Sequence, residues 1–140
     1  MNNPHIFTFQ KILPSHCGLP VVIALSMGSP TPKKVEQVLD SYRKPNRYLI
    51  GCWQTNRIIG MIGLEIGGAA GVIKHIAVLP EHRLQGVGKA LIKNAMDQFD
   101  LQTIHAETDD DSVEFYRKYG FTCQPFEGHY GKRYKCGYAP

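Results

Sequence analysis

The sequence predicts an α+β protein built on a mixed, mostly antiparallel sheet flanked by helices. Three strand-like segments follow one another at residues 48–54, 58–66 and 72–78, and the short turns between them favour antiparallel pairing. Helical patterns stand before and after this group of strands. The 140 residues leave room for one hydrophobic core, so we expect a single domain over residues 1–140.

The N-terminal third predicts one strand and two helices. Residues 5–12 alternate weakly and fit a first strand. Residues 15–43 contain two helical pieces, separated by a stretch with Gly28, Pro30 and Pro32. The second piece begins at Pro32, where the missing proline N–H costs no helical hydrogen bond. Its apolar face consists of Val35, Val38 and Leu39.

The middle of the chain predicts a hairpin and a third strand. The segments at residues 48–54 and 58–66 are joined by the tight turn Thr55-Asn56. A glycine-rich turn at residues 67–71 then leads into the strand at residues 72–78.

The C-terminal half predicts helices and strands in turn. Residues 85–99 have an apolar side chain at every fourth position, as expected for a helix packed on a sheet. A strand at residues 103–108 follows, and then a helix at residues 110–118 with Gly120 just beyond its end. The last two strands are expected at residues 121–124 and 133–136.

Composition and charge indicate an ordinary globular protein. The chain is 43% hydrophobic and 20% charged, with a formal net charge of +4. This mild excess of positive charge fits either a lysine-rich surface or a patch for an anionic ligand, such as a phosphorylated cofactor. No predicted helix is dense in Lys and Arg, so we do not expect nucleic acid as a partner.

The N-terminus and the cysteines favour a cytoplasmic protein. The first residues lack the basic and apolar segments of a signal peptide, and the longest apolar run, residues 19–27, is too short to cross a membrane. The cysteines are widely spaced and form no Cys-x-x-Cys pair, so we predict neither a zinc site nor a disulfide framework. Free thiols fit a reducing cytosol. The four cysteines are Cys17, Cys52, Cys123 and Cys136.

The segment from Val78 to Leu91 carries the clearest functional signal. A strand runs into a loop, and the loop runs into a helix whose first turn contains Gly86 and Gly88. Backbone amides at a helix start lack partners and carry partial positive charge, and glycine lets a phosphate approach them closely. With Arg83 and Lys89 nearby, the segment predicts a cradle for a diphosphate.

Other glycine motifs fit this segment less well. A dinucleotide-binding fingerprint needs a third small residue at position 91, which is Leu91. A P-loop needs Ser or Thr after its lysine, and Ala90 follows Lys89. A plain loop with glycines near a helix start stays open as the alternative.

Two segments together resemble the GNAT superfamily of N-acetyltransferases. The first is Arg83-x-x-Gly86-x-Gly88 preceded by Ala77-Val78-x-Pro80, which resembles the superfamily's acetyl-CoA signature. The second, residues 109–121, resembles its later helix-and-turn motif and stands in the expected order. The resemblance covers residues 47–136 and implies a GNAT-like fold. The superfamily often has Asn and Ala where this chain has Asp109 and Ser112.

The resemblance implies how acetyl-CoA, the expected co-substrate, would bind. Its diphosphate would lie on the backbone of the loop, and its pantetheine arm would pair with the preceding strand like an additional strand. A β-bulge at Ala77-Val78 is expected to open the sheet for it. The second motif would contact the arm. The implied binding residues are Ile76, Ala77, Val78, Arg83, Leu84, Gln85, Gly86, Val87, Gly88, Lys89, Asp109, Ser112 and Tyr116.

The resemblance also implies roles in acetyl transfer to an amine. The N–H of Val78 could hold the developing oxyanion. Tyr116 matches the tyrosine that protonates the departing thiolate, although its spacing also fits a core aromatic. Glu65 and His75 are candidates for the general base, and neutral amines would need none.

The remaining features narrow the prediction. We expect no metal, because the carboxylates at residues 109–111 suit a helix N-terminus by themselves. Residues 126–133 either shape the acceptor pocket or form a surface loop. The expected partners are CoA and a small amine or peptide, with monomer and homodimer both left open. A non-catalytic acyl-CoA-binding module is the alternative to an enzyme.

Overall fold

The computed structural model describes residues 7–140, so residues 5 and 6 of the predicted first strand lie outside the described residues. The described residues form one seven-stranded sheet with the strand order β1-β2-β3-β4-β5-β7-β6. The strands are β1 (Thr8–Lys11), β2 (Arg47–Gln54), β3 (Arg57–Gly67), β4 (Ala70–Val78), β5 (Thr103–Thr108), β6 (Thr122–Gly128) and β7 (Gly131–Tyr138). The helices are α1 (Leu19–Ala24), α2 (Pro32–Ser41), α3 (Val87–Gln98) and α4 (Val113–Tyr119), with a 3₁₀ turn η1 (Pro80–His82).

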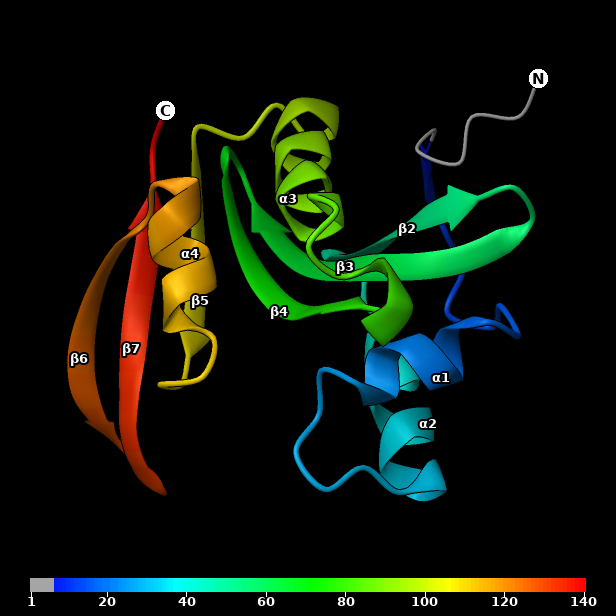
Figure 1. Cartoon of the computed structure of the whole chain (residues 1–140), viewed down its shortest axis with the longest axis horizontal. Helices are drawn as coiled ribbons and strands as arrows, with labels where there is room; N and C mark the ends of the chain where they lie inside the picture. The colour runs from blue at the N-terminus through cyan, green and yellow to red at the C-terminus, as the bar shows by residue number, and fades with distance from the viewer. Residues whose placement is uncertain (1–6) are drawn as a thin grey trace.

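The predicted mixed, mostly antiparallel sheet is confirmed. β4 and β5 are the parallel pair, and the other neighbouring strands pair antiparallel. The crossover between the parallel strands contains α3, which packs back onto the sheet (Figure 1).

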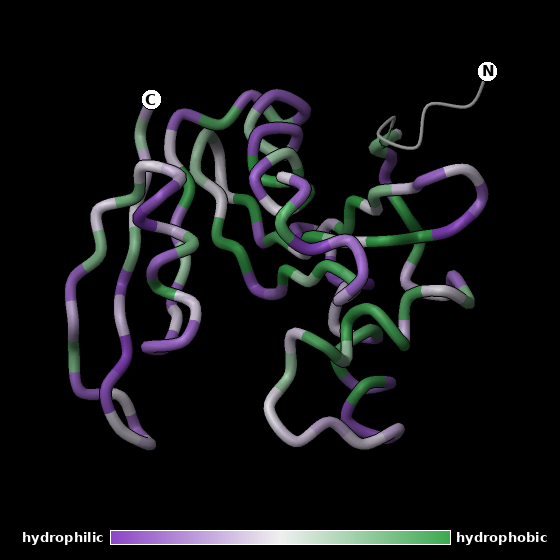
Figure 2. The backbone as a smooth tube through the Cα atoms, in the orientation of Figure 1, coloured by the Kyte–Doolittle hydropathy of each residue, from purple (hydrophilic) through white to green (hydrophobic). Residues whose placement is uncertain are grey.

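Helices cover both faces of the N-terminal part of the sheet (Figure 1). A Cβ placed on Gly60 of β3 would meet Val87 and Leu91 of α3. A Cβ placed on Gly63, three residues further along β3, would instead meet Tyr42 at the end of α2. Side chains alternate between faces along a strand, so α3 lies on one face and α1 with α2 on the other. Hydrophobic segments gather where these layers meet (Figure 2).

The sheet divides where β4 leaves β5. Their pairing starts at Ala70 opposite Thr103 and ends at Ile73 opposite Ala106. Beyond that point β4 curves away while β5 runs straight on beside β7 (Figure 1). The register between β3 and β4 shifts at the same level, leaving Lys74 as the additional residue. The bulge was therefore predicted in the wrong place, because it precedes Ala77-Val78 and lies where the strands separate.

The C-terminal strands are longer than predicted. β6 and β7 pair from Thr122 opposite Gly137 to Gly128 opposite Gly131. Most of residues 126–133, predicted as a loop, thus belongs to a hairpin. Pro125 is compatible with this pairing because β6 is an edge strand, where a missing N–H can face away from its neighbour.

The prediction of four free cysteines was wrong. Cys123 and Cys136 lie opposite each other in the β6–β7 hairpin and form a disulfide. Their spacing along the sequence did not show this, because the strands were predicted too short to bring them into register. Cys17 and Cys52 are the free cysteines of the described residues. None of the helices in the described residues is long and apolar enough to cross a membrane.

Candidate functional site

The turn before α3 presents a row of backbone amides. The helix starts at Val87, two residues later than predicted, and its N-cap Gly86 has a φ of 79°. Along residues 84–90, the first backbone amide that donates to a backbone carbonyl is that of Ala90, which donates to Gly86 O at 3.0 Å. The amides of residues 84–89 are therefore available to a ligand, and the helix dipole adds partial positive charge.

The two glycines of this turn have different surroundings. A Cβ on Gly86 would find no atom within 4 Å, so this position faces open space. A Cβ on Gly88 would come within 2.9 Å of the Phe115 ring of α4. Gly86 thus leaves room for an approaching group, whereas Gly88 lets α4 pack closely against α3.

The side chains of the loop point in different directions. Arg83 folds back, and its Nε donates to the carbonyl of Val78 at 3.2 Å. Leu84 has a φ of 63° and a fully exposed side chain, while Val87 is buried in the core. Gln85 and Lys89 are exposed. The loop therefore offers positive charge at its edges and backbone donors along its length.

β4 adds unpaired backbone groups beside this loop. Leu79 N donates to Ile59 O at 2.8 Å, and Val78 lies opposite Gly60. Because hydrogen-bonded and non-bonded pairs alternate in an antiparallel ladder, Ile76 and Val78 turn their N–H and C=O groups away from β3. β5 has already diverged at this level, so both N–H groups face the opening between β4 and β5.

The second segment of the resemblance, residues 109–121, contains α4, which lies on the other side of that opening. Asp109 Oδ1 accepts hydrogen bonds from the amides of Asp111 and Ser112, each at 3.1 Å, and so shapes the turn before the helix. Ser112 is the N-cap, but its side chain makes no capping bond. Tyr116 is 4% exposed and packs edge-on against Phe121, with ring centres 5.2 Å apart.

Burial and the Asp109 carboxylate raise the pKa of Tyr116 to about 12. The phenol is therefore protonated at neutral pH, as a proton donor must be. Its packing is also that of a core aromatic, so the structure combines the two interpretations that the sequence left open.

Glu65 and His75 lie on the α1–α2 face of the sheet, and each has a partner. The carboxylate of Glu65 accepts a hydrogen bond from Arg47 Nε at 2.7 Å, directly across the β2–β3 ladder. His75 Nδ1 lies 2.5 Å from Tyr42 Oη. Arg47 also lies over the Tyr42 ring, 5.8 Å from its centre. Their predicted role as general base remains a prediction.

The partners Tyr42 and Arg47 were missed by the sequence analysis. Tyr42 lies just beyond α2 and belongs to no motif. Gly63 was the available signal, because a glycine inside a strand often marks a close approach by another group. A Cβ there would overlap the Tyr42 hydroxyl.

Electrostatics keep His75 uncharged. Burial, Arg47 and Lys74 together lower the pKa of His75 to about 4. Burial also raises the pKa of Tyr42 above its usual value, against the opposing effect of Arg47. At neutral pH the pair is therefore a phenol bonded to a neutral imidazole.

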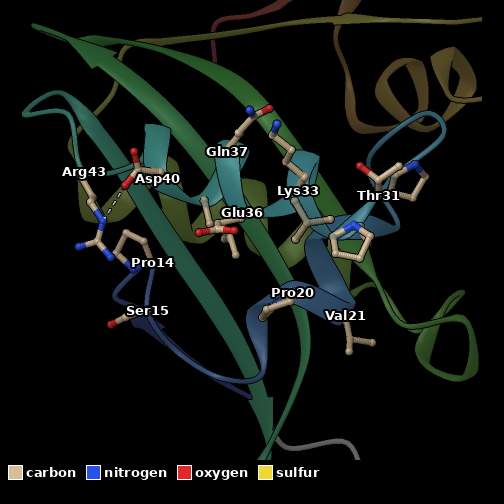
Figure 3. Close-up of a pocket in the computed structure, with 15 residues that line it drawn as sticks. Pro14, Ser15, Pro20, Val21, Thr31, Lys33, Glu36, Gln37, Asp40 and Arg43 are labelled. Carbon is tan, nitrogen blue, oxygen red and sulfur yellow. Dashed lines mark hydrogen bonds and ion pairs between the residues drawn. The ribbon is translucent and has the colours of Figure 1, made fainter.

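An open groove of about 980 Å³ lies apart from the loop, between α1 and α2 (Figure 3). Pro20 and Val21 of α1 line one side, and Lys33, Glu36 and Asp40 of α2 line the other. None of residues 76–89 lines it. Among the residues that the structure describes, no group of three or more His, Cys, Asp or Glu side chains is placed to hold a metal ion.

The comparison with protein families shows to which family the chain belongs. The model of the acetyltransferase (GNAT) domain matches residues 28–129, which is more than half of the sequence. The chain belongs to the GNAT acetyltransferase family. The matched residues include the loop before α3, the strand β4 that borders the opening, and α4.

Individual relatives agree with this membership. An uncharacterized N-acetyltransferase in the lysA 3′ region of Bacillus methanolicus is 36% identical over 67 residues, which are 46% of this chain and 56% of that protein. The alignment thus spans about half the length of this curated relative. This GNAT chain also shares its fold with solved structures.

Two of these structures show the extent of the likeness. An aminoglycoside 6′-N-acetyltransferase complexed with coenzyme A has a TM-score of 0.81 at 13% identity, over 94% of this chain and 96% of that one. A GNAT acetyltransferase from Elizabethkingia anophelis with acetyl-CoA bound has a TM-score of 0.73 at 18% identity, over 96% and 98%.

Proposed function

We propose that this GNAT protein is an acyltransferase that moves an acetyl group from acetyl-CoA to a primary amine of a small molecule or peptide. The observation that carries the proposal is that two sets of free backbone N–H groups occur together in one site. The amides of residues 84–89 lie at the start of α3, and the N–H groups of Ile76 and Val78 face the opening beside β4. Solved structures of the same fold contain CoA or acetyl-CoA.

The chain fits CoA at both of its recognition elements. The loop amides and the dipole of α3 suit a diphosphate, and Gly86 leaves its approach open. Arg83 and Lys89 would add charge at the edges of the loop. The outward N–H groups of Ile76 and Val78, with the C=O group of Ile76, suit an extended amide-bearing arm, which would bind as an additional strand.

Three groups would then act on the reaction. Acetyl-CoA supplies the activated acetyl thioester. The N–H of Val78 would donate to the oxygen that becomes negative as the amine attacks. The Tyr116 phenol would give its proton to the departing sulfur. The amine would lose its proton to solvent or to a base.

Binding and turnover test the proposal separately. We expect CoA and acetyl-CoA to bind with micromolar affinity and to raise the melting temperature, since a ligand of the native state stabilises it by mass action. A panel of polyamines, aminoglycosides, amino acids and peptides, assayed for release of CoA, should contain an acetylated acceptor. No calorimetric binding at millimolar CoA would overturn the proposal. Binding without turnover on the whole panel would favour a non-catalytic acyl-CoA-binding module.

A further inference from the structure

We propose that His75 acts as a hydrogen-bond donor to the acceptor substrate through its Nε2–H, in a tautomer fixed by Tyr42, and not as the general base. The inference rests on the proposed acetyl transfer, but the tautomer itself is a property of the free protein. It starts from the 2.5 Å contact between Tyr42 Oη and His75 Nδ1.

The surroundings of Tyr42 determine which group donates in this contact. Its side chain is buried, at 4% exposure, and its hydroxyl lies against the backbone of Gly63. Within residues 7–140, His75 Nδ1 is the hydrogen-bond partner of this hydroxyl. If His75 Nδ1 carried the hydrogen, the phenol proton would be left without an acceptor, which is costly for a buried group. Tyr42 therefore donates, and Nδ1 accepts.

The charges around the ring leave His75 with a single proton. Arg47 and Lys74 both disfavour an imidazolium, and the Glu65 carboxylate on the same face of the sheet is bonded to Arg47. With Nδ1 accepting, the one ring hydrogen is on Nε2. A ring in this state has no nitrogen lone pair free to take a proton from an amine.

The Nε2 atom of His75 is accessible next to the strand that borders the opening. Among the described residues, the buried side-chain nitrogen and oxygen atoms without a hydrogen-bond partner are His82 Nδ1 and Asn94 Oδ1. The Nε2 atom of His75 also has no partner in the described part of the chain but is not one of these atoms, so it is not buried. His75 directly precedes Ile76, whose backbone faces the opening beside β4. Its side chain lies on the α1–α2 face, opposite to α3. A neutral donor here can bind an oxygen of the acceptor without repelling its ammonium group.

The tautomer is measured directly by NMR of the two ring nitrogens of His75 in the ligand-free protein at pH 7. We expect a protonated Nε2 and an unprotonated Nδ1 with the shift of a hydrogen-bond acceptor. Tyr42→Phe should release this preference and give a mixture of both tautomers, whereas Tyr48→Phe on β2, a matched loss of one hydroxyl, should leave it unchanged. A proton on Nδ1, or an imidazolium at pH 7, would overturn the inference whether or not the protein is an enzyme.

The role toward substrate is tested by comparing two replacements of His75 with an acceptor found in the panel. His75→Gln keeps an N–H donor but cannot act as a base, and we expect kcat/KM to fall by less than about tenfold. His75→Ala removes the donor and should lower kcat/KM by about 10²-fold or more. Tyr42→Phe should cost about five- to thirtyfold. Equal losses in the Gln and Ala variants, with CoA affinity retained, would show a general base and refute the donor role while leaving acetyl transfer intact.

Discussion

Tyr116 shows how one residue can serve both packing and chemistry. Its ring packs edge-on against Phe115 and Phe121, and its burial raises the pKa of the phenol to about 12. Burial holds the ring in place and keeps the proton on it. The sequence motif gives no means of separating these effects, because both require an aromatic residue on this face of α4.

Replacing Tyr116 by Phe separates them. The ring and its contacts stay, so we expect stability to change by about 1 kcal/mol or less. Loss of the proton donor should lower turnover by about 10²- to 10⁴-fold at neutral pH, with CoA affinity little changed. The difference in turnover between the wild type and the variant should become smaller as pH rises, because a thiolate can then leave without a proton donor. Turnover measured from pH 6 to pH 10 checks this, and a variant matching the wild type throughout would leave Tyr116 as a core residue only.

The candidate residues that belong to local motifs could be named from the sequence, and their roles stay predictions. The glycine loop, Val78 and Tyr116 belong to local motifs, so their order along the chain located them. Tyr42 and Arg47 reach their partners across the sheet from other elements. Such contacts depend on register and on which side chains share a face, which one sequence does not give. For this reason the candidates Glu65 and His75 were named without the groups that hold them.

At the scale of elements, the start of α3 separates the two glycines by function. Gly86→Val should lower CoA affinity at least about tenfold, because its side chain would enter the open approach to the loop amides. The φ of 79° adds strain, at about 1–2 kcal/mol of stability. Calorimetry with CoA and thermal unfolding measure the two effects.

Gly68→Val is the matched control for that strain. Gly68 has a φ of 61° and open surroundings too, but it lies in the turn between β3 and β4. We expect a similar loss of stability with unchanged CoA affinity. Gly88→Ala should instead disturb the packing of Phe115. If Gly86→Val and Gly68→Val bind CoA equally well, the loop is not the diphosphate site.

The accuracy of the element predictions follows the strength of the local signals. The β2–β3 hairpin and β5 were predicted closely, because alternation and turn residues bound them. The β6–β7 hairpin was predicted too short, because Pro125 and Gly128 interrupt the strand pattern without ending the pairing. The disulfide was missed for the same reason. The bulge at Lys74 has no local signature and follows from the separation of β4 and β5.

At the scale of the molecule, the sheet is two parts joined by a short parallel contact. β1–β4 with α1, α2 and α3 form one part, and β5, β7 and β6 with α4 form the other. The pairing of residues 70–73 with residues 103–106 joins the strands of the two parts, and Gly88 of α3 against Phe115 of α4 is a further contact between them. A ligand bound in the opening between β4 and β5, beyond this junction, would contact both parts and hold them together.

This arrangement predicts an alternating pattern of amide protection when CoA binds. The N–H groups of Ile76 and Val78 face the opening, so CoA should slow their hydrogen exchange by about tenfold or more if they bond the extended arm. The amide of Ala77, which turns toward β3, should change much less, because its hydrogen bond is already made. The amides of residues 87–89 should gain protection from the diphosphate.

Residue-resolved exchange by NMR, with and without saturating CoA, measures this pattern. The amides of β1 are the internal control, because that strand lies at the other edge of the sheet. General stabilisation by ligand would slow exchange throughout the cooperative core, including Ala77 and its neighbours alike. A pattern that follows the alternation of β4 therefore requires direct bonding along the strand. Uniform protection of residues 75–78, or protection confined to the loop, would contradict a strand-like arm and leave CoA held by its diphosphate alone.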